Sequence, residues 1–416
     1  MFKFVLQLFI IALFWFINAK SKRTFLSPSS FLIGIYMVSA AFGIATLYVV
    51  DYTEPYYSRY WLPMLVFDLF IILFLYPFKY FNETRISFIK LPRIDILDTI
   101  SAIIIVLSFY AIFFYFSTIS AIFSMDSLKE AREMRYDEGE FFETGIMNTI
   151  ASVSSSLYVF AIMFFFIYSV IGGHLKRRIL LLIASSSEPI HVLAFVGRDG
   201  IVFWLFSFVF LYLFFKPFLA ETVLKSIRKL FIVVSIIAMI PFALISISRF
   251  GEGDNYLYSE TIRYIGESFI NGPLYFGLNP PPTNIGRQFP LFYELIGSKL
   301  PDKPDLIQIG DWASFHFSTF VVSLYQSLDL EGLIILCFFM AVFFYLFIGK
   351  IKTRLFAHTL ILYMLYFQIL SQGVFYFRQC TRGGNLFILL CLIFSLLLCV
   401  IEHDEKAVVL INNKKV

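Results

Sequence analysis

The stretch FKFVLQLFIIALFWFINA, Phe2–Ala19, decides the fold class of this chain. It is almost wholly apolar and approaches the length of about 20 residues that a helix needs to cross a bilayer. The basic residues Lys20, Lys22 and Arg23 follow this run, whereas a cleaved signal peptide carries its basic residues before the apolar part. We therefore expect a membrane helix that is retained as an anchor.

The composition extends this interpretation to the whole chain. Hydrophobic residues make up 59% of the 416 residues, charged residues make up 15%, and the mean hydropathy is +0.81. Soluble domains usually contain about 25% charged residues. No long polar linker separates the apolar runs, so we predict a single membrane domain over residues 1–416. A chain of this kind gives no reason to expect a nucleic-acid partner.

The four cysteines indicate neither a disulfide framework nor a metal site. Cys337, Cys391 and Cys399 lie within apolar segments, and only Cys380 lies in a predicted loop. Their spacing fits no metal-binding motif. We therefore expect no metal and no cofactor.

Apolar runs recur along the chain and predict an all-α polytopic membrane protein with about eleven spans. The predicted spans are residues 2–18, 29–50, 60–78, 97–117, 147–171, 179–196, 201–215, 230–248, 331–349, 356–375 and 386–401. Lysine and arginine collect in alternate loops, which the positive-inside rule assigns to the cytoplasm. The N-terminus is then external and the C-terminus cytoplasmic.

One external loop, about residues 249–330, is too long to be a simple turn. Within it, Ile262, Ile265 and Phe269 form an apolar stripe at helical spacing. Glu260, Arg263 and Glu267 share a different face of the same predicted helix. This pattern is typical of a short helix that lies on or near the membrane surface.

A charged pair between two glycines, GRDG at Gly197–Gly200, joins two of the shorter predicted spans on the external side. We expect a tight turn in which glycine supplies unusual backbone angles, with Arg198 projecting into an external space. An interfacial arginine that contacts lipid headgroups explains Arg198 equally well. Further arginines lie on this otherwise acidic side, however, and a guanidinium group binds phosphate oxygens in a bidentate manner. These arginines are Arg249, Arg263, Arg378 and Arg382.

Two carboxylates occur within predicted spans, where an ionised group usually faces a cavity or a partner. Glu188 follows three serines, precedes Pro189 and stands three residues before His191, which indicates local unwinding that lines a polar space. The alternative for Glu188 is a hydrogen-bonded role in helix packing. For the isolated Asp68, this packing role is the favoured interpretation. His316, in the large loop, is either a reactive group or an inert surface residue.

These features resemble the bacterial O-antigen polymerases of the Wzy type, also called oligosaccharide repeat-unit polymerases. The resemblance is carried by the number of spans, the GRDG turn, the large late external loop that begins Ser-Arg-Phe, and the segment STFVVSLYQSLDLEGLIILC. In that family the last segment often contains Thr, Tyr, Asp and Gly, which here are Thr319, Tyr325, Asp329 and Gly332. Some members also place a glycine eleven residues after a catalytic arginine. Neither Arg249 nor Arg263 has one, so only Arg198 and Arg249 match by context.

The resemblance implies a metal-independent glycosyltransferase at the external leaflet of the bacterial inner membrane. Such enzymes move a growing glycan from undecaprenyl pyrophosphate onto the sugar of another lipid-linked repeat unit. Membrane lipids surround them, and a chain-length regulator is a candidate partner. The implied catalytic residues are Arg198, Arg249, Glu188 and His316, with Asp199 and Glu252 as further candidates for the base. The implied substrate-binding residues are Arg263, Arg378, Arg382, Asp199, Tyr258 and Tyr264, although the two tyrosines are equally explained as interfacial belt residues.

Three alternatives remain at this stage. An O-antigen ligase shares the layout and places a histidine in its large loop, a role that His316 would fill. A lipid-linked oligosaccharide flippase is a transporter, and such folds show two similar halves, which this sequence lacks. A membrane scaffold or receptor without enzymatic activity is the third alternative.

Overall fold

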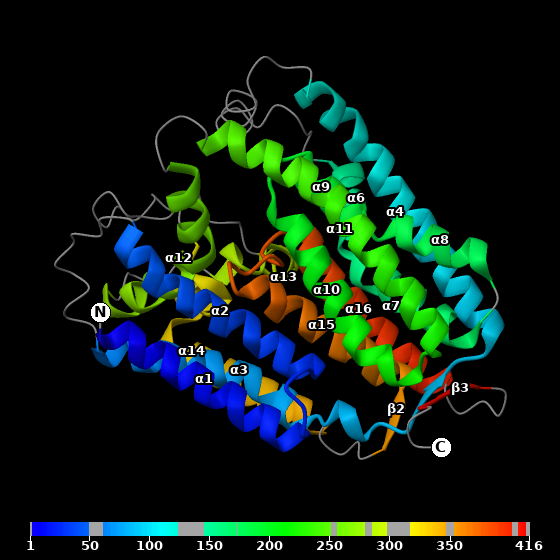
Figure 1. Ribbon diagram of the computed structural model, residues 1–416, viewed down its shortest axis with the longest axis horizontal. Coiled ribbons are helices and arrows are strands. Elements are labelled where there is room, and N and C mark those ends of the chain that lie inside the picture. Colours follow the sequence, from blue (N-terminus) through cyan, green and yellow to red (C-terminus); the bar gives the residue numbers. More distant parts are fainter. Residues whose placement is uncertain are drawn as a thin grey trace. The chain divides into compact units, whose positions relative to one another are not determined.

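The computed structural model describes residues 2–49, 61–123, 145–172, 174–250, 256–278, 285–297, 317–346, 353–401 and 407–412. These parts of the chain are mainly helical, with one small sheet (Figure 1). Eight of the described helices are long and apolar enough to cross a membrane, and a bent helix pair makes a ninth candidate. The chain is thus a multi-pass α-helical membrane protein, as the apolar runs predict.

The described helices are α1 (Phe2–Lys22), α2 (Pro28–Val49), α3 (Trp61–Tyr80), α4 (Ile94–Phe123), α6 (Ile146–Ser156), α7 (Tyr158–Ile171), α8 (Leu175–Ala184), α9 (Ser187–Leu193), α10 (Asp199–Phe215), α11 (Glu221–Phe250), α12 (Tyr256–Leu278), α13 (Pro290–Leu295), α14 (Thr319–Phe344), α15 (Ala357–Gly373) and α16 (Arg382–Ile401). Short 3-10 helices are η2 (Glu83–Arg85), η3 (Lys216–Phe218) and η4 (Ile285–Arg287), and the strands are β1 (Phe88–Leu91), β2 (Arg354–Phe356) and β3 (Val408–Ile411).

Three of the predicted spans differ from simple crossing helices. The segment 179–196 is divided between α8 and α9 at Ser185 and Ser186, which keep right-handed helical angles and backbone hydrogen bonds. The segment 147–171 is the pair α6 and α7, bent by 41°. Helix α15 has 17 residues, fewer than the roughly 20 that a span requires.

Helix α14 begins twelve residues before the span predicted at 331–349. It contains a kink at Asp329, whose backbone angles are φ 58° and ψ −179°. The part after the kink corresponds to the predicted span. The part before it lies within the predicted external loop and adds a helical segment there, which the sequence pattern did not reveal.

The described chain forms two compact units. Unit 1 comprises residues 1–85, 258–352 and 366–385, and unit 2 comprises residues 86–257, 353–365 and 386–416. Each unit therefore combines segments that are far apart in the sequence.

In unit 1, small residues of α2 allow close packing against α12. Ser39 Oγ and Thr46 Oγ1 donate to backbone carbonyls of α12 at 2.6 and 3.3 Å. A Cβ atom added to Gly266 would lie 2.2 Å from the carbonyl carbon of Phe42. Such contacts between small residues are typical of helix pairs in membranes. The helix expected in this segment is present as α12, and it is buried within the protein from Gly266 to Pro273.

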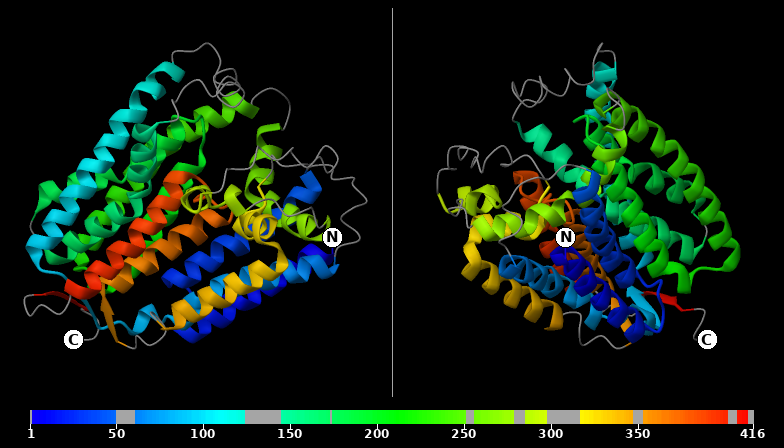
Figure 2. Two further views of the ribbon diagram at one scale, coloured as in Figure 1. Left: turned by 180° about the vertical axis from the view of Figure 1, so that it is seen from behind. Right: turned by 60° about the vertical axis from the view of Figure 1, so that its left-hand side comes forward.

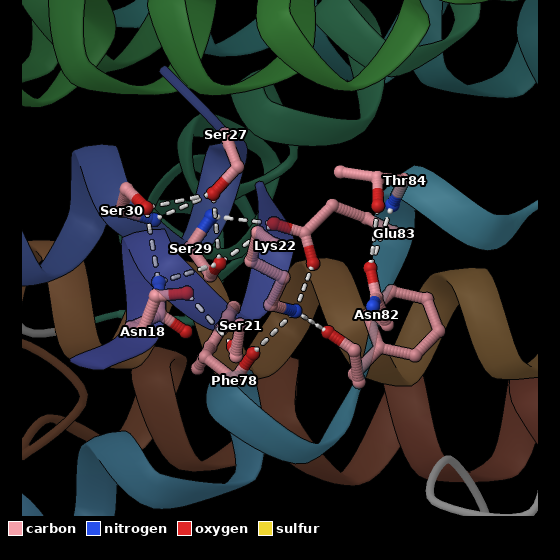
Figure 3. Close-up of polar contacts among 11 residues, drawn as sticks. Asn18, Ser21, Lys22, Ser27, Ser29, Ser30, Phe78, Asn82, Glu83 and Thr84 are labelled. Atoms are coloured by element: carbon pink, nitrogen blue, oxygen red, sulfur yellow. Dashed lines mark hydrogen bonds and ion pairs between the residues drawn. The ribbon is translucent and has the colours of Figure 1, made fainter. Parts of the chain in front are cut away.

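A buried ion pair connects the end of α1 to η2 in the same unit (Figure 3). Lys22 Nζ donates to Glu83 Oε2 at 2.5 Å and also to the backbone carbonyls of Phe78 and Phe81. Glu83 Oε1 accepts from the backbone N–H and the hydroxyl of Ser29 at 3.0 and 2.7 Å. Both charged groups have several partners here, which offsets the cost of removing them from water.

Asp68 is also buried in unit 1, on α3. It is 1% exposed, and its Oδ1 accepts from Gln7 Nε2 of α1 at 2.9 Å. Its Oδ2 has no hydrogen-bond partner among the described residues. This contact supports the favoured alternative from the sequence, in which Asp68 takes part in helix packing.

In unit 2, α7 is the central helix. Its residues from Tyr158 to Ser169 are all buried, as expected for a helix that is apolar on every side. Phe166 stacks on Phe215 at the end of α10 with ring centroids 5.7 Å apart. Aromatic packing of this kind fixes α10, and with it the turn that precedes α10, against the centre of the unit.

A three-stranded sheet joins three loops of unit 2 in the order β2-β1-β3. Figure 2 shows the chain around it from two further sides. Strand β1 pairs in parallel with β2 and antiparallel with β3. All three strands lie in segments that the positive-inside rule assigns to the cytoplasm. Their pairing brings these three segments together.

Candidate functional site

The GRDG segment forms the turn between α9 and α10 in unit 2, and Arg198 is the residue that immediately precedes α10. The expected reason for its glycines is wrong, because the positive φ angle of this turn, 51°, belongs to Val196. Glycine is required instead for close packing. A Cβ atom at Gly197 or Gly200 would lie 2.6 or 2.7 Å from side-chain atoms of Val192 on α9. The glycines therefore let α9 and α10 pack as a tight hairpin.

Arg198 is buried rather than projecting into an open space. It is 2% exposed, and its Nη1 donates to Ser246 Oγ of α11 at 2.7 Å. Its guanidinium carbon lies 5.5 Å from the ring centre of Phe242, one turn earlier on α11. Contact with lipid headgroups alone does not explain this position. The hairpin holds a permanent positive charge in a low-dielectric environment, where its field is strong.

Arg249 belongs to the last turn of the same helix, α11. It follows Ser246 by three residues, a spacing that places two residues on neighbouring positions of one helix face. The backbone therefore brings Arg249 close to the helix position that contacts Arg198. The side chain of Arg249 lies outside the described part of the structure.

Glu188 and His191 form a buried acid-imidazole contact on α9. His191 Nδ1 lies 3.3 Å from Glu188 Oε2 and 3.0 Å from Ser155 Oγ of α6. The imidazole ring stacks on Tyr115 of α4, with ring centroids 4.5 Å apart. These contacts fix the orientation of the imidazole ring, which is a requirement for defined proton transfer.

Asp199 occupies the first turn of α10 and is 9% exposed. A carboxylate at this position interacts favourably with the positive end of the helix dipole. A Cβ atom added to Gly200 would lie 2.9 Å from the carbonyl oxygen of Glu188. The hairpin thus places two carboxylates, an imidazole and a buried guanidinium within two short adjoining segments.

The other arginines predicted to bind substrate belong to unit 1. Arg263 of α12 contacts Glu260 Oε1 at 3.3 Å and Glu267 Oε1 at 3.4 Å, so these three residues share a face as predicted. Arg382 contacts Glu294 of α13 through Nε at 3.1 Å and through Nη2. The fold therefore balances the charge of both arginines with carboxylates.

Arg378 and Tyr264 lie close to an aromatic cluster in unit 1. Arg378 Nη1 donates to the hydroxyl of Tyr376 at 3.2 Å. The ring centre of Tyr264 lies 4.8 Å from that of Phe317 and 5.5 Å from that of Phe375. Tyr258, by contrast, is 64% exposed, which fits either a ligand contact or the alternative interfacial position.

Burial raises the pKa of the Cys380 thiol, which lies in the turn between α15 and α16. The nearby guanidinium groups of Arg378 and Arg287 act in the opposite direction. Arg287, in η4, was not singled out by the sequence pattern, which gave no signal that η4 approaches this turn.

The chain matches no protein-family model, no curated protein and no solved structure.

The predicted site residues therefore fall into two groups. Arg198, Asp199, Glu188 and Arg249 belong to unit 2, and Arg263, Tyr258, Tyr264, Arg378 and Arg382 belong to unit 1. His316 and Glu252 lie outside the described residues. Within those residues, no group of three or more His, Cys, Asp and Glu side chains could hold a metal ion. Sequence reasoning missed Ser246, Ser155 and Tyr115, because they lie on helices distant in sequence from the turn.

Proposed function

We propose that this protein is an oligosaccharide repeat-unit polymerase that acts on glycans linked to undecaprenyl pyrophosphate at the external leaflet of the bacterial inner membrane. The observation that carries this proposal is Arg198, a buried guanidinium in a tight hairpin whose first helix, α9, carries the buried pair Glu188 and His191. Arg249 belongs to the last turn of α11, three residues after Ser246, which contacts Arg198.

These groups suit the chemistry of glycan transfer. A hydroxyl oxygen of the acceptor sugar attacks the anomeric carbon of the donor and forms the new glycosidic bond. The bond between that carbon and the pyrophosphate oxygen breaks, and the lipid pyrophosphate leaves with the bonding electrons. A fixed guanidinium group stabilises the negative charge that develops there. Glu188, through its contact with His191, provides a carboxylate and imidazole system that accepts the hydroxyl proton.

Polymerisation with purified protein and a defined lipid-linked repeat unit tests the proposal. We expect Arg198→Ala to abolish elongation, and Arg198→Lys to restore only part of it because an ammonium group cannot bind two phosphate oxygens in parallel. Arg93→Ala is the matched control, since the Arg93 side chain is 41% exposed and pairs locally with Asp95. Normal glycan length from correctly folded Arg198→Ala protein would rule out the assignment of Arg198.

Deletion of the gene distinguishes the proposed activity from its alternatives. Loss of a polymerase leaves single repeat units on the final acceptor, and loss of a ligase leaves long chains on the lipid carrier. Loss of a flippase traps repeat units at the cytoplasmic face. Labelling of cysteines introduced on both sides of the membrane tests the proposed orientation, with an external N-terminus and a cytoplasmic C-terminus.

A further inference from the structure

Buried amide and hydroxyl side chains gather in unit 1 where α15 leads into α16. Gln379 Nε2 donates to Gln372 Oε1 at 2.7 Å, and Asn385 Nδ2 donates to the carbonyl of Gln379 at 2.7 Å. Each of the cluster's side chains is at most 6% exposed, and none carries a charge. The members are Asn271, Gln288, Thr319, Gln372, Gln379 and Asn385.

Two atoms of this cluster have no hydrogen-bond partner among the described residues: Gln379 Oε1 and Thr319 Oγ1. Both side chains are almost fully buried, at 3% and 0% exposure. The two residues adjoin the same segment, because Thr319 N donates to the carbonyl of Phe375 and Gln379 contacts Gln372. A buried polar atom without a partner costs roughly 1–3 kcal/mol. A water, an ion or a bound molecule commonly supplies the missing hydrogen bond of such an atom.

Thr319 also has an unusual backbone conformation, with a φ angle of 67°. A β-branched residue rarely adopts this region, and such strain is concentrated at binding and catalytic sites. Ser318 N and Thr319 N both donate to the carbonyl of Phe375, at 3.2 and 3.1 Å, and this pair of hydrogen bonds holds Thr319 in place. The strain thus coincides with the hydroxyl that lacks a partner.

Half-exposed aromatic rings and a guanidinium group lie beside this cluster. Phe317 and Tyr376 stack with an interplanar angle of 11° and ring centroids 5.9 Å apart. Arg378 donates to the Tyr376 hydroxyl, and Asn271 Nδ2 donates to the carbonyl of Phe317 at 3.1 Å. Aromatic surface is therefore connected directly to buried neutral donors and acceptors.

From this arrangement we infer that the cluster binds one sugar residue of the glycan. A sugar ring presents many uncharged hydroxyl groups, which match neutral amides and a threonine hydroxyl, and it has an apolar face that packs on aromatic rings. A phosphate group would instead require cations as direct ligands. The inference rests on the proposed function, which makes a glycan the substrate, and it assigns the recognition of that glycan to unit 1.

Thr319→Val tests the inference, because it replaces only the hydroxyl and keeps the branched shape. We expect the unliganded protein to unfold at the same or a higher temperature, since an unpartnered polar atom has been removed. We also expect the apparent KM for the lipid-linked repeat unit to rise about two- to tenfold, the loss of one neutral hydrogen bond. Thr319→Ser, which retains the hydroxyl, should keep the KM of the wild type.

Direct binding separates this inference from the proposed function. Saturation-transfer NMR on the full chain uses methyl glycosides of glucose, galactose, mannose and N-acetylglucosamine as probes. We expect transfer to at least one probe, and a weaker signal with Thr319→Val. The inference is overturned if no probe binds the wild type, if Thr319→Val binds equally well, or if this variant is destabilised while Thr319→Ser is not. Glycoside binding without any polymerisation would instead refute the proposed function.

Discussion

Replacing Gly266 by alanine is the most severe small change that the structure predicts. The added Cβ atom would lie 2.2 Å from the carbonyl carbon of Phe42, 2.3 Å from the nitrogen of Gly43 and 2.4 Å from the oxygen of Phe42. All three are backbone atoms of α2, so no side-chain rotation relieves the overlap. Helices α2 and α12 must move apart by about 1 Å to reach ordinary carbon contacts of roughly 3.5 Å.

The expected loss of stability follows from the contacts that this separation of α2 and α12 disrupts. Overpacking alone costs about 1–3 kcal/mol. The separation also lengthens the hydrogen bonds from Ser39 and Thr46 to carbonyls of α12, and such bonds between membrane helices contribute about 0.6 kcal/mol each on average. We therefore expect Gly266→Ala to lower the free energy of unfolding by about 3 kcal/mol.

Unfolding in a titration with sodium dodecyl sulfate, followed by circular dichroism, measures this loss. Gly34→Ala is the matched control on α2, because its Cβ atom would meet only Trp15 Nε1, at an ordinary distance of 3.7 Å. We expect the control to keep the stability of the wild type or to raise it by up to about 1 kcal/mol, because alanine favours a helix more than glycine does. If Gly266→Ala unfolded at the same detergent fraction as Gly34→Ala, the close approach of α2 and α12 would be incorrect.

Three further predictions concern buried polar groups. Glu83→Ala should destabilise the protein by about 3–5 kcal/mol in the same titration, because it leaves the Lys22 ammonium buried without its carboxylate. The double variant Glu83→Ala with Lys22→Met should recover much of this stability. Equal destabilisation of the single and the double variant would contradict the prediction. Asp68→Leu should cost about 1–3 kcal/mol by removing the partner of Gln7, and Asp68→Asn much less, because its amide oxygen still accepts. The raised pKa of Cys380 should keep maleimide labelling at this residue slow at pH 8.5, where an ordinary thiol is about half ionised. The pKa of the Cys380 thiol is higher in the folded than in the unfolded protein, so the protonated thiol stabilises the fold fully below about pH 8.5. This stabilisation is lost as the pH rises further, and Cys380→Ala should abolish that pH dependence.

The membrane helices were predictable because the bilayer imposes one requirement on every residue of a span. Phe2–Lys22 and Pro28–Val49 have a mean hydropathy of 1.9 in their most apolar windows. A composition of that kind leaves few alternatives to a crossing helix. The loop charges predict that the segments of β1, β2 and β3 share one side, and these strands do pair with one another.

The parts that could not be predicted depend on contacts between distant segments. The stripe of Ile262 and Phe269 shows that α12 has an apolar face, but the same stripe fits a lipid surface and a protein core. The close contact of Gly266 with the backbone of α2 shows that this face packs in the protein core. That contact can be seen only in the folded structure. Likewise, the sequence shows that Gly197 and Gly200 stand in a turn, whereas their actual function is to admit the side chain of Val192.

The contacts of the arginines also determine how much each can contribute to binding a pyrophosphate. Arg263 and Arg382 contact carboxylates within unit 1, and a guanidinium group engaged in this way must give up or share its partner before it binds phosphate. Arg198 instead donates to the neutral hydroxyl of Ser246. Exchanging a neutral acceptor for a charged phosphate oxygen strengthens the hydrogen bond. Arg198 is also 2% exposed, whereas the side chains of Arg263 and Arg382 are 21% and 54% exposed, so water screens a phosphate least at Arg198. Its replacement should impair catalysis more than that of Arg263 or Arg382, and polymerisation rates for the three alanine variants measure this order.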